Sequence, residues 1–552
     1  MEDGSIRAAV AEERFSRIKH DNGFPVLAAE YCLASSGKTI YDLDAIAFYD
    51  KPLLKFERVL FTHFRQFPWS LPAFLRHMPN WLNNNLSIPH HIHTNLSSEA
   101  PVYFINHHES HAASAFYPSG FDHALIITAD GVGDWSTTSW GIGEGHRISL
   151  KQEINFPDSL GLLYATLTTF LGFYANGGEG KVMGLAAHGS PTYKEAFQWI
   201  IQVRDDGSFA LDPSYFSYSR SGSRMYSSKL IKLLGPPREP ESELTERHCD
   251  IAATLQHVLE EAMIKMVRHL TKLTGLKKLC MAGGIGLNCV ANGKILEQID
   301  VEELFVQPAS GDDGGAIGAP LFLYHQVLGN TDRKSLDTYY LGPEYSQIYT
   351  RSILKRQENA PIQWEELDDE ELIGRTAAAI KENRIIGWFQ GRMEFGPRAL
   401  GARSILANPC NPDMKDILNH RVKKRESFRP FAPAVLADRA ADYFSLKQPS
   451  PYMLIAASVK EEARDRVPAI THVDNTARIQ TVTPDTNPLF FKLLEKLGEV
   501  NGEPMVLNTS FNLRGEPIVC TPENALSCFF GTKIDVLVMN DFWIEKRKQQ
   551  GG

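Results

Sequence analysis

The stretch from His107 to Gly145 constrains the fold of this chain more than any other part of the sequence. It reads HHESHAASAFYPSGFDHALIITADGVGDWSTTSWGIGEG, which predicts a short helix, a buried strand ending at Asp130 and a glycine-rich hairpin. His107 and His111 share one helical face, so their rings can reach one metal ion. Gly131 and Gly133 allow a backbone to come close to a phosphate. Nucleotide chemistry beside a metal is one interpretation; two polar residues on an ordinary helix is the other.

Length and composition limit the classes of protein to which the chain can belong. With 552 residues it is too long for one core, and 43% apolar and 22% charged residues are ordinary for a soluble globular protein. The net charge of −9 argues against a general nucleic-acid binder. No apolar run is long enough to span a bilayer, and the opening residues show no secretory pattern. The seven cysteines form no Cys-x-x-Cys pair, so a cytoplasmic location is expected.

Strands alternate with helices in the first part of the chain, which predicts an α/β domain with sites at the carboxyl ends of its strands. A strand at Lys278–Ala282 leads into a glycine turn and a helix start, a typical anion site. A second strand, Leu304–Gln307, leads to two adjacent acids that are natural metal ligands near phosphates. A glycine-rich loop at 177–184 carries one lysine, but its spacing is not that of a P-loop. A helix is predicted from about Thr245 to Leu273.

Two stretches have a less specific pattern. The charged segment Glu12–Asp21 is either a solvated face or the wall of a polar site. The stretch Leu60–Ser98 is rich in aromatic residues, prolines and histidines, and it predicts a surface insertion that serves as a lid or an acceptor-binding element. His90, His91 and His93 within it lack an element that would point all three rings inward, so a metal site is not expected there.

The composition changes near Gly329–Tyr345, which predicts a linker before a second domain. The following sequence is dense in arginine and lysine beside Gly, Ser, Thr and Asn, which is unusual surface decoration for an acidic protein. Guanidinium forks bind phosphate or carboxylate oxygens through paired hydrogen bonds. The alternative is a set of structural salt bridges.

In sequence order, these motifs resemble the NodU/CmcH-type O-carbamoyltransferases that act on nodulation factors and antibiotics. The resemblance covers nearly the whole chain and rests on EERFSRIKHD, HHESHAASAF, TADGVGD, GEGKVMGLA, AGGIGLNCVANG, GDDGGAIGA, GRMEFGPRALGARSILA, RPFAP, HVDNTARIQTV and LNTSFNLRGEPIV. It implies an actin-like, ATPase-type (ASKHA) α/β domain at 1–335, similar to the universal tRNA threonylcarbamoyltransferase. A YrdC/Sua-like α/β domain that forms carbamoyl-adenylate is implied at 345–552.

The resemblance implies a reaction in two stages. The second domain would use carbamoyl phosphate and ATP, with Mg²⁺, to make carbamoyl-adenylate. The first domain, with Fe²⁺ or another divalent metal, would pass the carbamoyl group to a hydroxyl of a small-molecule acceptor, such as a secondary metabolite or a sugar. Neither nucleic acid nor membrane is an expected partner, and a homodimer is only the default expectation.

The resemblance also assigns site residues. The metal ligands would be His107, His111, Asp130 and Asp312, the last preferred over Asp313. The catalytic residues would be Lys19, His107, Asp130, Arg398 and Lys423. The substrate and nucleotide contacts would come from Gly131, Gly133, Lys181, Gly283, Gly284, Asn288, Asp313, Arg398, Arg403, Lys423, Arg429, Arg478, Asn508 and Arg514.

The chain departs from the family pattern in one place. Family members begin with a further strand and a His-Asp/Ser-rich turn before the equivalent of Glu2, and this sequence lacks it. Two rival hypotheses therefore stay beside carbamoyl transfer to a small molecule. One is a tRNA threonylcarbamoyl-type enzyme, and the other is a nucleotide-binding homologue left inactive by the missing strand.

Overall fold

The computed structural model describes residues 1–68, 70–217, 224–357 and 360–547, which belong to two compact units. The first unit combines Met1–Arg7 with Ser36–Leu336. The second combines Ala8–Ser35 with Asp337–Gly552, so the charged segment near the N-terminus belongs with the later part of the chain. The sequence-based domain limits of 1–335 and 345–552 stay a prediction.

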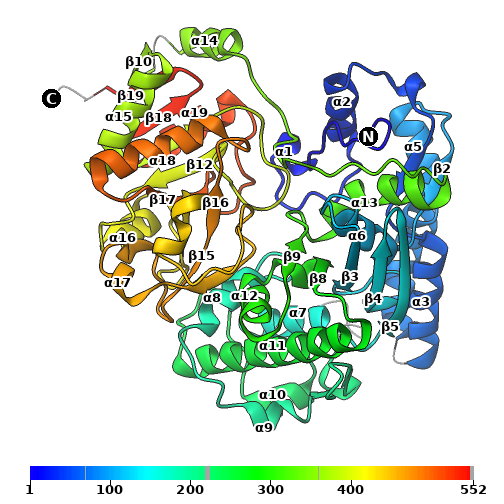
Figure 1. The fold of residues 1–552 in the computed structure, drawn as a ribbon. Coiled ribbons are helices and arrows are strands. Elements are labelled where there is room, and N and C mark those ends of the chain that lie inside the picture. The colour runs from blue at the N-terminus through cyan, green and yellow to red at the C-terminus, as the bar shows by residue number, and fades with distance from the viewer. Residues whose placement is uncertain (69, 218–223, 358–359, 548–552) are drawn as a thin grey trace. The chain divides into compact units, whose positions relative to one another are not determined.

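The first unit contains a five-stranded sheet with the order β5-β4-β3-β8-β9. The strands β3 (His123–Ala129), β4 (Ser136–Glu144) and β5 (Arg147–Asn155) form an antiparallel meander, and β8 (Lys278–Ala282) and β9 (Glu303–Val306) continue the sheet parallel to β3 (Figure 1). Six of the seven β3 residues are buried, as its apolar run predicts. Because β3, β8 and β9 are parallel, their carboxyl ends meet at one edge of the sheet.

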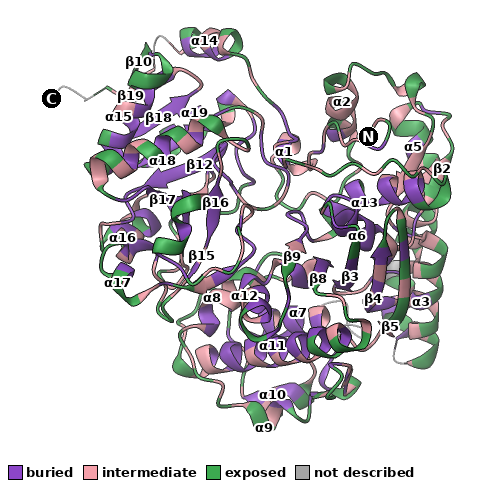
Figure 2. Ribbon diagram, in the orientation of Figure 1, coloured by how far each residue is buried: buried purple, intermediate pink, exposed green. Residues whose placement is uncertain are grey.

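Helices cover the sheet of the first unit. α6 (His107–Phe116) packs against α13 (Gly315–Phe322), and a Cβ at Gly318 would lie 1.8 Å from the carbonyl oxygen of Ser110, so only glycine fits this crossing. α11 (Glu246–Thr274) matches the helix predicted from Thr245 to Leu273, and its apolar stripe is buried (Figure 2). It packs against α7 (Leu160–Phe170), α8 (Glu179–Ala186) and α12 (Cys289–Gln298).

In the sequence, a helical segment separates two short strands, β1 (Ile46–Phe48) and β2 (Val102–Phe104), which pair with each other in parallel. It consists of α3 (Pro52–Arg65), α4 (Leu71–Asn80), the π-helical turn η2 (Trp81–Asn85) and α5 (Ile88–Leu96). Its helices therefore begin before the stretch predicted as an insertion. α3 has exposed and half-buried residues along its length (Figure 2), with Arg58 as its buried residue.

The second unit is built on an eight-stranded mixed sheet with the order β10-β19-β18-β11-β12-β17-β13-β16. Helices α15 (Asp369–Lys381) and α18 (Pro488–Asn501) share one apolar core with one face, whereas α14 (Gln347–Arg356), α16 (Met414–Leu418) and α19 (Pro522–Gly531) belong to the core on the other. The strands are β10 (Ile362–Glu366), β11 (Ile386–Phe389), β12 (Arg403–Ala407), β13 (Ala432–Leu436), β16 (Gln480–Val482), β17 (Met505–Ser510), β18 (Val536–Met539) and β19 (Phe542–Lys546).

The predicted α/β fold class is confirmed in both units. Among the described helices, none combines the length and the apolarity that crossing a membrane would require.

Candidate functional site

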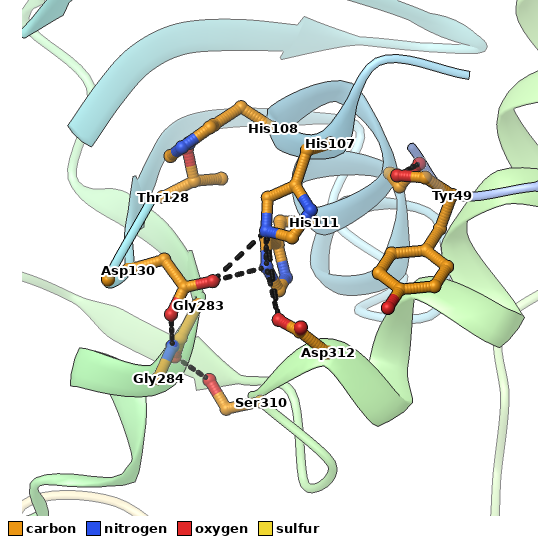
Figure 3. Close-up of polar contacts among 12 residues, drawn as sticks. Tyr49, His107, His108, His111, Thr128, Asp130, Gly283, Gly284, Ser310 and Asp312 are labelled. Atoms are coloured by element: carbon orange, nitrogen blue, oxygen red, sulfur yellow. Dashed lines mark hydrogen bonds and ion pairs between the residues drawn. The ribbon is translucent and has the colours of Figure 1, made fainter. Parts of the chain in front are cut away.

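Four side chains from three segments of the first unit, namely α6, the end of β3 and the stretch after β9, converge at the carboxyl ends of β3 and β9 (Figure 3). The Nε2 atoms of His107 and His111 are 3.0 Å apart, and Oδ2 of Asp130 lies 3.0 Å and 3.2 Å from them. Oδ1 of Asp312 lies 3.7 Å from Nε2 of His107 and 3.9 Å from Nε2 of His111. One ligand atom from each residue lies within 4.8 Å of all the others, which leaves a place for a single ion.

The start of α6 places the two imidazoles at this edge of the sheet. The side chain of Asn106 accepts a hydrogen bond from the backbone N–H of His108 at 3.0 Å and so caps the helix. Oδ2 of Asp134 accepts from the backbone N–H of His107 at 3.1 Å. A Cβ at Gly133 would lie 2.8 Å from the ring of His107. The glycine that predicted a phosphate loop thus gives the hairpin room to pack against the imidazole.

The carboxylates around the imidazoles create an electrostatic demand for a cation. Burial by itself lowers the pKa of His107, but hydrogen bonds with Asp130 and Asp50 outweigh it and raise this pKa to about 10. Burial favours a protonated Asp130, yet contacts with both imidazoles hold its pKa well below its usual range. Oδ1 of Asp130 also accepts from the backbone N–H of Gly284 at 3.1 Å. In the absence of an ion, a proton on His107 offsets part of this negative charge.

The donor set fits the iron-type metal that the family resemblance implies. Two imidazole nitrogens on one helical turn with carboxylate oxygens beside them form a mixed N/O set that suits divalent iron. The side chain of Asp312 is 58% exposed, whereas the two imidazoles are almost fully buried, so the fourth ligand is the one that faces solvent. The structure brings together all four predicted ligands; metal binding itself stays a prediction.

The third histidine of the motif, His108, makes its contacts within the fold and not with the four-residue group. His108 points away from the four-residue group (Figure 3), with Nδ1 at 2.7 Å from Oγ1 of Thr128 and Nε2 at 2.9 Å from the carbonyl oxygen of Ser136. Burial lowers the pKa of His108 to about 3, so the ring is neutral. It connects α6 to the hairpin below the site.

In the predicted nucleotide loop of the first unit, Gly283 and Asn288 both have roles in the fold. Gly283 adopts a φ of +93°, and a Cβ there would lie 2.2 Å from the carbonyl oxygen of Ala129, so this position requires glycine. Asn288 accepts from the backbone N–H of Ala291 at 3.0 Å and exchanges two hydrogen bonds with Gln256, so it holds the start of α12.

Gly131, Lys181 and Asp313 are further predicted binding residues of the first unit. The carbonyl oxygen of Gly131 accepts from Oγ of Ser159 at 2.6 Å. Nζ of Lys181 lies 5.3 Å from the centre of the Phe173 ring. Asp313 is exposed beside Asp312 and is not one of the four converging residues. Their roles in nucleotide binding stay predictions.

A group of cations forms a second candidate site, within the second unit. Burial and repulsion from Arg425 lower the pKa of Lys423 well below its usual range. Burial and repulsion from Arg429 and Arg478 lower the pKa of Arg425 to about 9. The group, here called the cation cluster, consists of Lys19, Lys423, Arg425, Arg429, Arg478 and Arg514, which interact with one another electrostatically. Glu426 offsets part of the repulsion at Arg425 and Arg429, and a bound polyanion would relieve more of it.

Lys423 is the buried member at the centre of the cation cluster. It ends η7 (Asn419–Lys423), a π-helical turn, and Lys424 follows in the left-handed region at φ 44°. Such turns are frequent at functional sites. Nζ of Lys423 donates to Oδ1 of Asn512 at 2.9 Å and also to the carbonyl oxygen of Ser510. All of these acceptors are neutral, so the charge of the ammonium group is solvated but not paired.

The remaining predicted residues of the second unit differ in environment. Arg403 is completely buried, donates to the carbonyl oxygens of Gln390 and Pro343, and lies 3.7 Å from the Phe389 ring centre. Its surroundings give it a role in the fold and provide no support for nucleotide binding. Asn508 is buried in β17 and donates to Oε1 of Gln480 at 2.8 Å, and Arg398 is half-buried in the loop between β11 and β12.

His472 gives the second unit a measurable acid dependence. Its Nε2 donates to the carbonyl oxygen of Phe431 at 3.2 Å, and burial lowers its pKa to about 4. The unfolded state binds a proton on His472 more readily than the folded state does. The free energy of unfolding therefore decreases by about 3 kcal/mol as the pH is lowered from about 6.5 to about 4. Urea unfolding at several pH values measures this fall. In His472→Gln the contribution should disappear, and an unchanged pH profile in this variant would contradict the assignment.

Sequence reasoning missed three residues that shape these sites. Asp50 contacts His107, and Asp134 anchors its backbone, whereas Arg425 belongs to the cation cluster. Asp134 lies in the TADGVGD motif, so its proximity to Asp130 was the available signal. No local pattern distinguishes Asp50, because its contact with His107 arises only through the fold.

Comparisons with known proteins identify the family to which the chain belongs. Residues 1–321 match the family described as Carbamoyltransferase N-terminus, and residues 377–546 match Carbamoyltransferase C-terminus. The chain belongs to the carbamoyltransferase family and is a carbamoyltransferase.

Three relatives cover most of the chain. An uncharacterized protein of Synechocystis sp. is 44% identical over 100% of this chain and 94% of its own length. Nodulation protein NolNO of Sinorhizobium fredii is 37% identical over 99% of this chain and 78% of its own. Nodulation protein NolO of Bradyrhizobium diazoefficiens is 37% identical over 80% of this chain and 79% of its own. The predicted resemblance to the nodulation-type carbamoyltransferases is thereby confirmed.

Proposed function

We propose that this chain is an ATP-dependent O-carbamoyltransferase that modifies a hydroxyl of a small-molecule acceptor, such as a secondary metabolite or a sugar. In the first stage, carbamoyl phosphate, ATP and water give carbamoyl-adenylate, phosphate and pyrophosphate. In the second, the acceptor oxygen forms a bond to the carbamoyl carbon, the hydroxyl proton leaves, and AMP departs. The observation that carries the proposal is the cation cluster of the second unit, a site suited to two polyanions, in a chain of the carbamoyltransferase family.

The side chains of the cation cluster divide the work of the first stage. Lys423 is buried and Arg425 is half-buried, so their charges act on phosphate oxygens with less screening than exposed cations would. Arg514 and Lys19 are exposed and can guide the anions inward. The predicted use of Mg²⁺ belongs to this stage, in which it would accompany the phosphates of ATP.

The four converging residues of the first unit serve the second stage. His107, His111, Asp130 and Asp312 would hold Fe²⁺ or another divalent ion. Such an ion supplies Lewis-acid polarisation at the transfer centre when bound. The two imidazoles are almost fully buried, so water does not reach their side of the site, whereas Asp312 leaves the site open to solvent and to the acceptor.

We also propose that the protein works in the cytoplasm. The seven cysteines are all free, and the predicted donors, ATP and carbamoyl phosphate, are intracellular metabolites.

The proposal predicts two separable activities in purified protein. With carbamoyl phosphate, ATP and Mg²⁺, pyrophosphate release should occur and should require carbamoyl phosphate. Addition of Fe²⁺ and a panel of hydroxylated acceptors should give a product heavier by one carbamoyl group, measured by mass spectrometry. Absence of any ATP-to-AMP turnover would reject the proposal. A shift of tRNA in a gel would instead favour the rival tRNA-modifying function.

A further inference from the structure

Asp50 connects the metal-ligand group with the helical insertion of the first unit. It lies just before α3, and its side chain is only 8% exposed. Oδ1 of Asp50 is 2.8 Å from Nδ1 of His107, and Oδ2 is 2.7 Å from Nζ of Lys55 on α3. The carboxylate therefore bridges a predicted metal ligand and the first helix of the insertion.

The contact fixes which nitrogen of His107 carries the proton. A carboxylate can only accept, so Nδ1 of His107 has to donate to Asp50. In the neutral ring this leaves a lone pair on Nε2, the atom that faces His111 and Asp130. A partner on the outer nitrogen also limits rotation of the ring.

We infer that Asp50, held by Lys55, is a positioning residue that orients His107 for metal binding and makes the order of α3 depend on the occupied site. The inference rests on the proposed metal site and is independent of the carbamoyl acceptor. An ordinary buried ion pair between Asp50 and Lys55 is the competing explanation, and it predicts an effect on stability alone.

A second set of contacts joins the same helix to the same site. Oδ1 of Asp134 accepts from the backbone N–H of Lys51 at 2.9 Å, while its Oδ2 accepts from the backbone N–H of His107. Nε of Arg58 donates to the backbone carbonyl oxygen of Asp134 at 2.8 Å. α3 is thus tied to both ends of the His107 residue, its ring through Asp50 and its backbone through Asp134. Movement of α3 cannot leave the ligand geometry unchanged.

Titration of Co²⁺ into the full-length protein tests the positioning role, because the visible spectrum of Co²⁺ reports its coordination. In Asp50→Asn, the amide can donate to Nδ1 of His107 and place the proton on Nε2, which removes the lone pair. We expect a dissociation constant weaker by about 10- to 100-fold and an altered spectrum. Asp50→Glu should recover part of the affinity. Asp300→Asn, which breaks an exposed ion pair with Lys277, is the matched control and should bind as the wild type does.

Hydrogen exchange of the α3 amides tests the link to the insertion. Co²⁺ should slow exchange across Pro52–Arg65 in the wild type, and Lys55→Met should reduce this protection while its side chain, 31% exposed, allows normal folding. Unchanged Co²⁺ affinity and spectrum in Asp50→Asn would overturn the inference and leave a structural ion pair. If the wild type binds no Co²⁺, the metal site falls and the inference with it. If Co²⁺ binds but no carbamoyl transfer occurs, only the proposed reaction is rejected.

Discussion

Replacement of His111 by alanine is expected to slow carbamoyl transfer severely and to leave carbamoyl-adenylate formation intact. His111 is 1% exposed, and its Nε2 is 3.0 Å from that of His107 and 3.2 Å from Oδ2 of Asp130. Its loss removes one of two nitrogen donors. Lewis-acid polarisation contributes several kcal/mol to such a transfer, so the rate of acceptor carbamoylation should fall by about 1000-fold. Product formation is measured by mass spectrometry, and pyrophosphate release is measured in parallel.

The parallel measurement of pyrophosphate release distinguishes loss of the metal from misfolding of the protein. Because the cation cluster belongs to the other compact unit, a folded His111→Ala protein should still convert ATP to AMP at the wild-type rate. His269→Ala is the matched control, since His269 is exposed on α11 and is not part of the four-residue group. Transfer activity close to that of the wild type in His111→Ala would show that the four residues do not form the transfer site.

The sequence alone was sufficient to predict those features of the metal-ligand group that depend on local pattern. The spacing of His107 and His111 predicts a shared helical face, and α6 has both on it. The apolar run before Asp130 predicts a buried strand, which is β3. Asp312 needed a further step, because it joins the group only if β9 lies parallel to β3 through β8, as it does. The resemblance to a known family supplied that step.

Contacts that depend on distant packing could not be read from the sequence. Asp50 is separated from His107 by the whole helical insertion, and no motif marks it. Arginines pose a similar difficulty, since a guanidinium donates equally well to phosphate and to backbone carbonyl oxygens. Arg403 and Arg429 lie in motifs of similar composition, yet Arg403 donates to carbonyl oxygens inside the fold and Arg429 interacts with the cation cluster. Only the structure distinguishes the two.

Replacement of Lys423 by methionine, unlike loss of His111, is expected to impair the first half-reaction, which supplies carbamoyl-adenylate to the second. Carbamoyl phosphate-dependent pyrophosphate release should fall by at least about 100-fold, because the variant lacks the cluster's most buried ammonium group. Nζ of Lys423 donates to Asn512 and Ser510, which hold it in place, and the lowered pKa shows that its charge is costly until an anion binds. Steady-state assays of pyrophosphate release measure the loss.

The stability of Lys423→Met distinguishes a binding role from a structural one. Methionine is close to lysine in length and has no charge to desolvate, so the free energy of unfolding should be unchanged or higher. Lys424→Met is the matched control: Lys424 is the exposed neighbour, and its replacement should leave pyrophosphate release near the wild-type rate. If Lys423→Met unfolds more easily and retains its activity, Lys423 supports the fold. Lost catalysis together with preserved stability is the result expected of a polyanion-binding site. The buried charge of such a site lowers the free energy of unfolding, and only binding of the anionic ligand compensates for this.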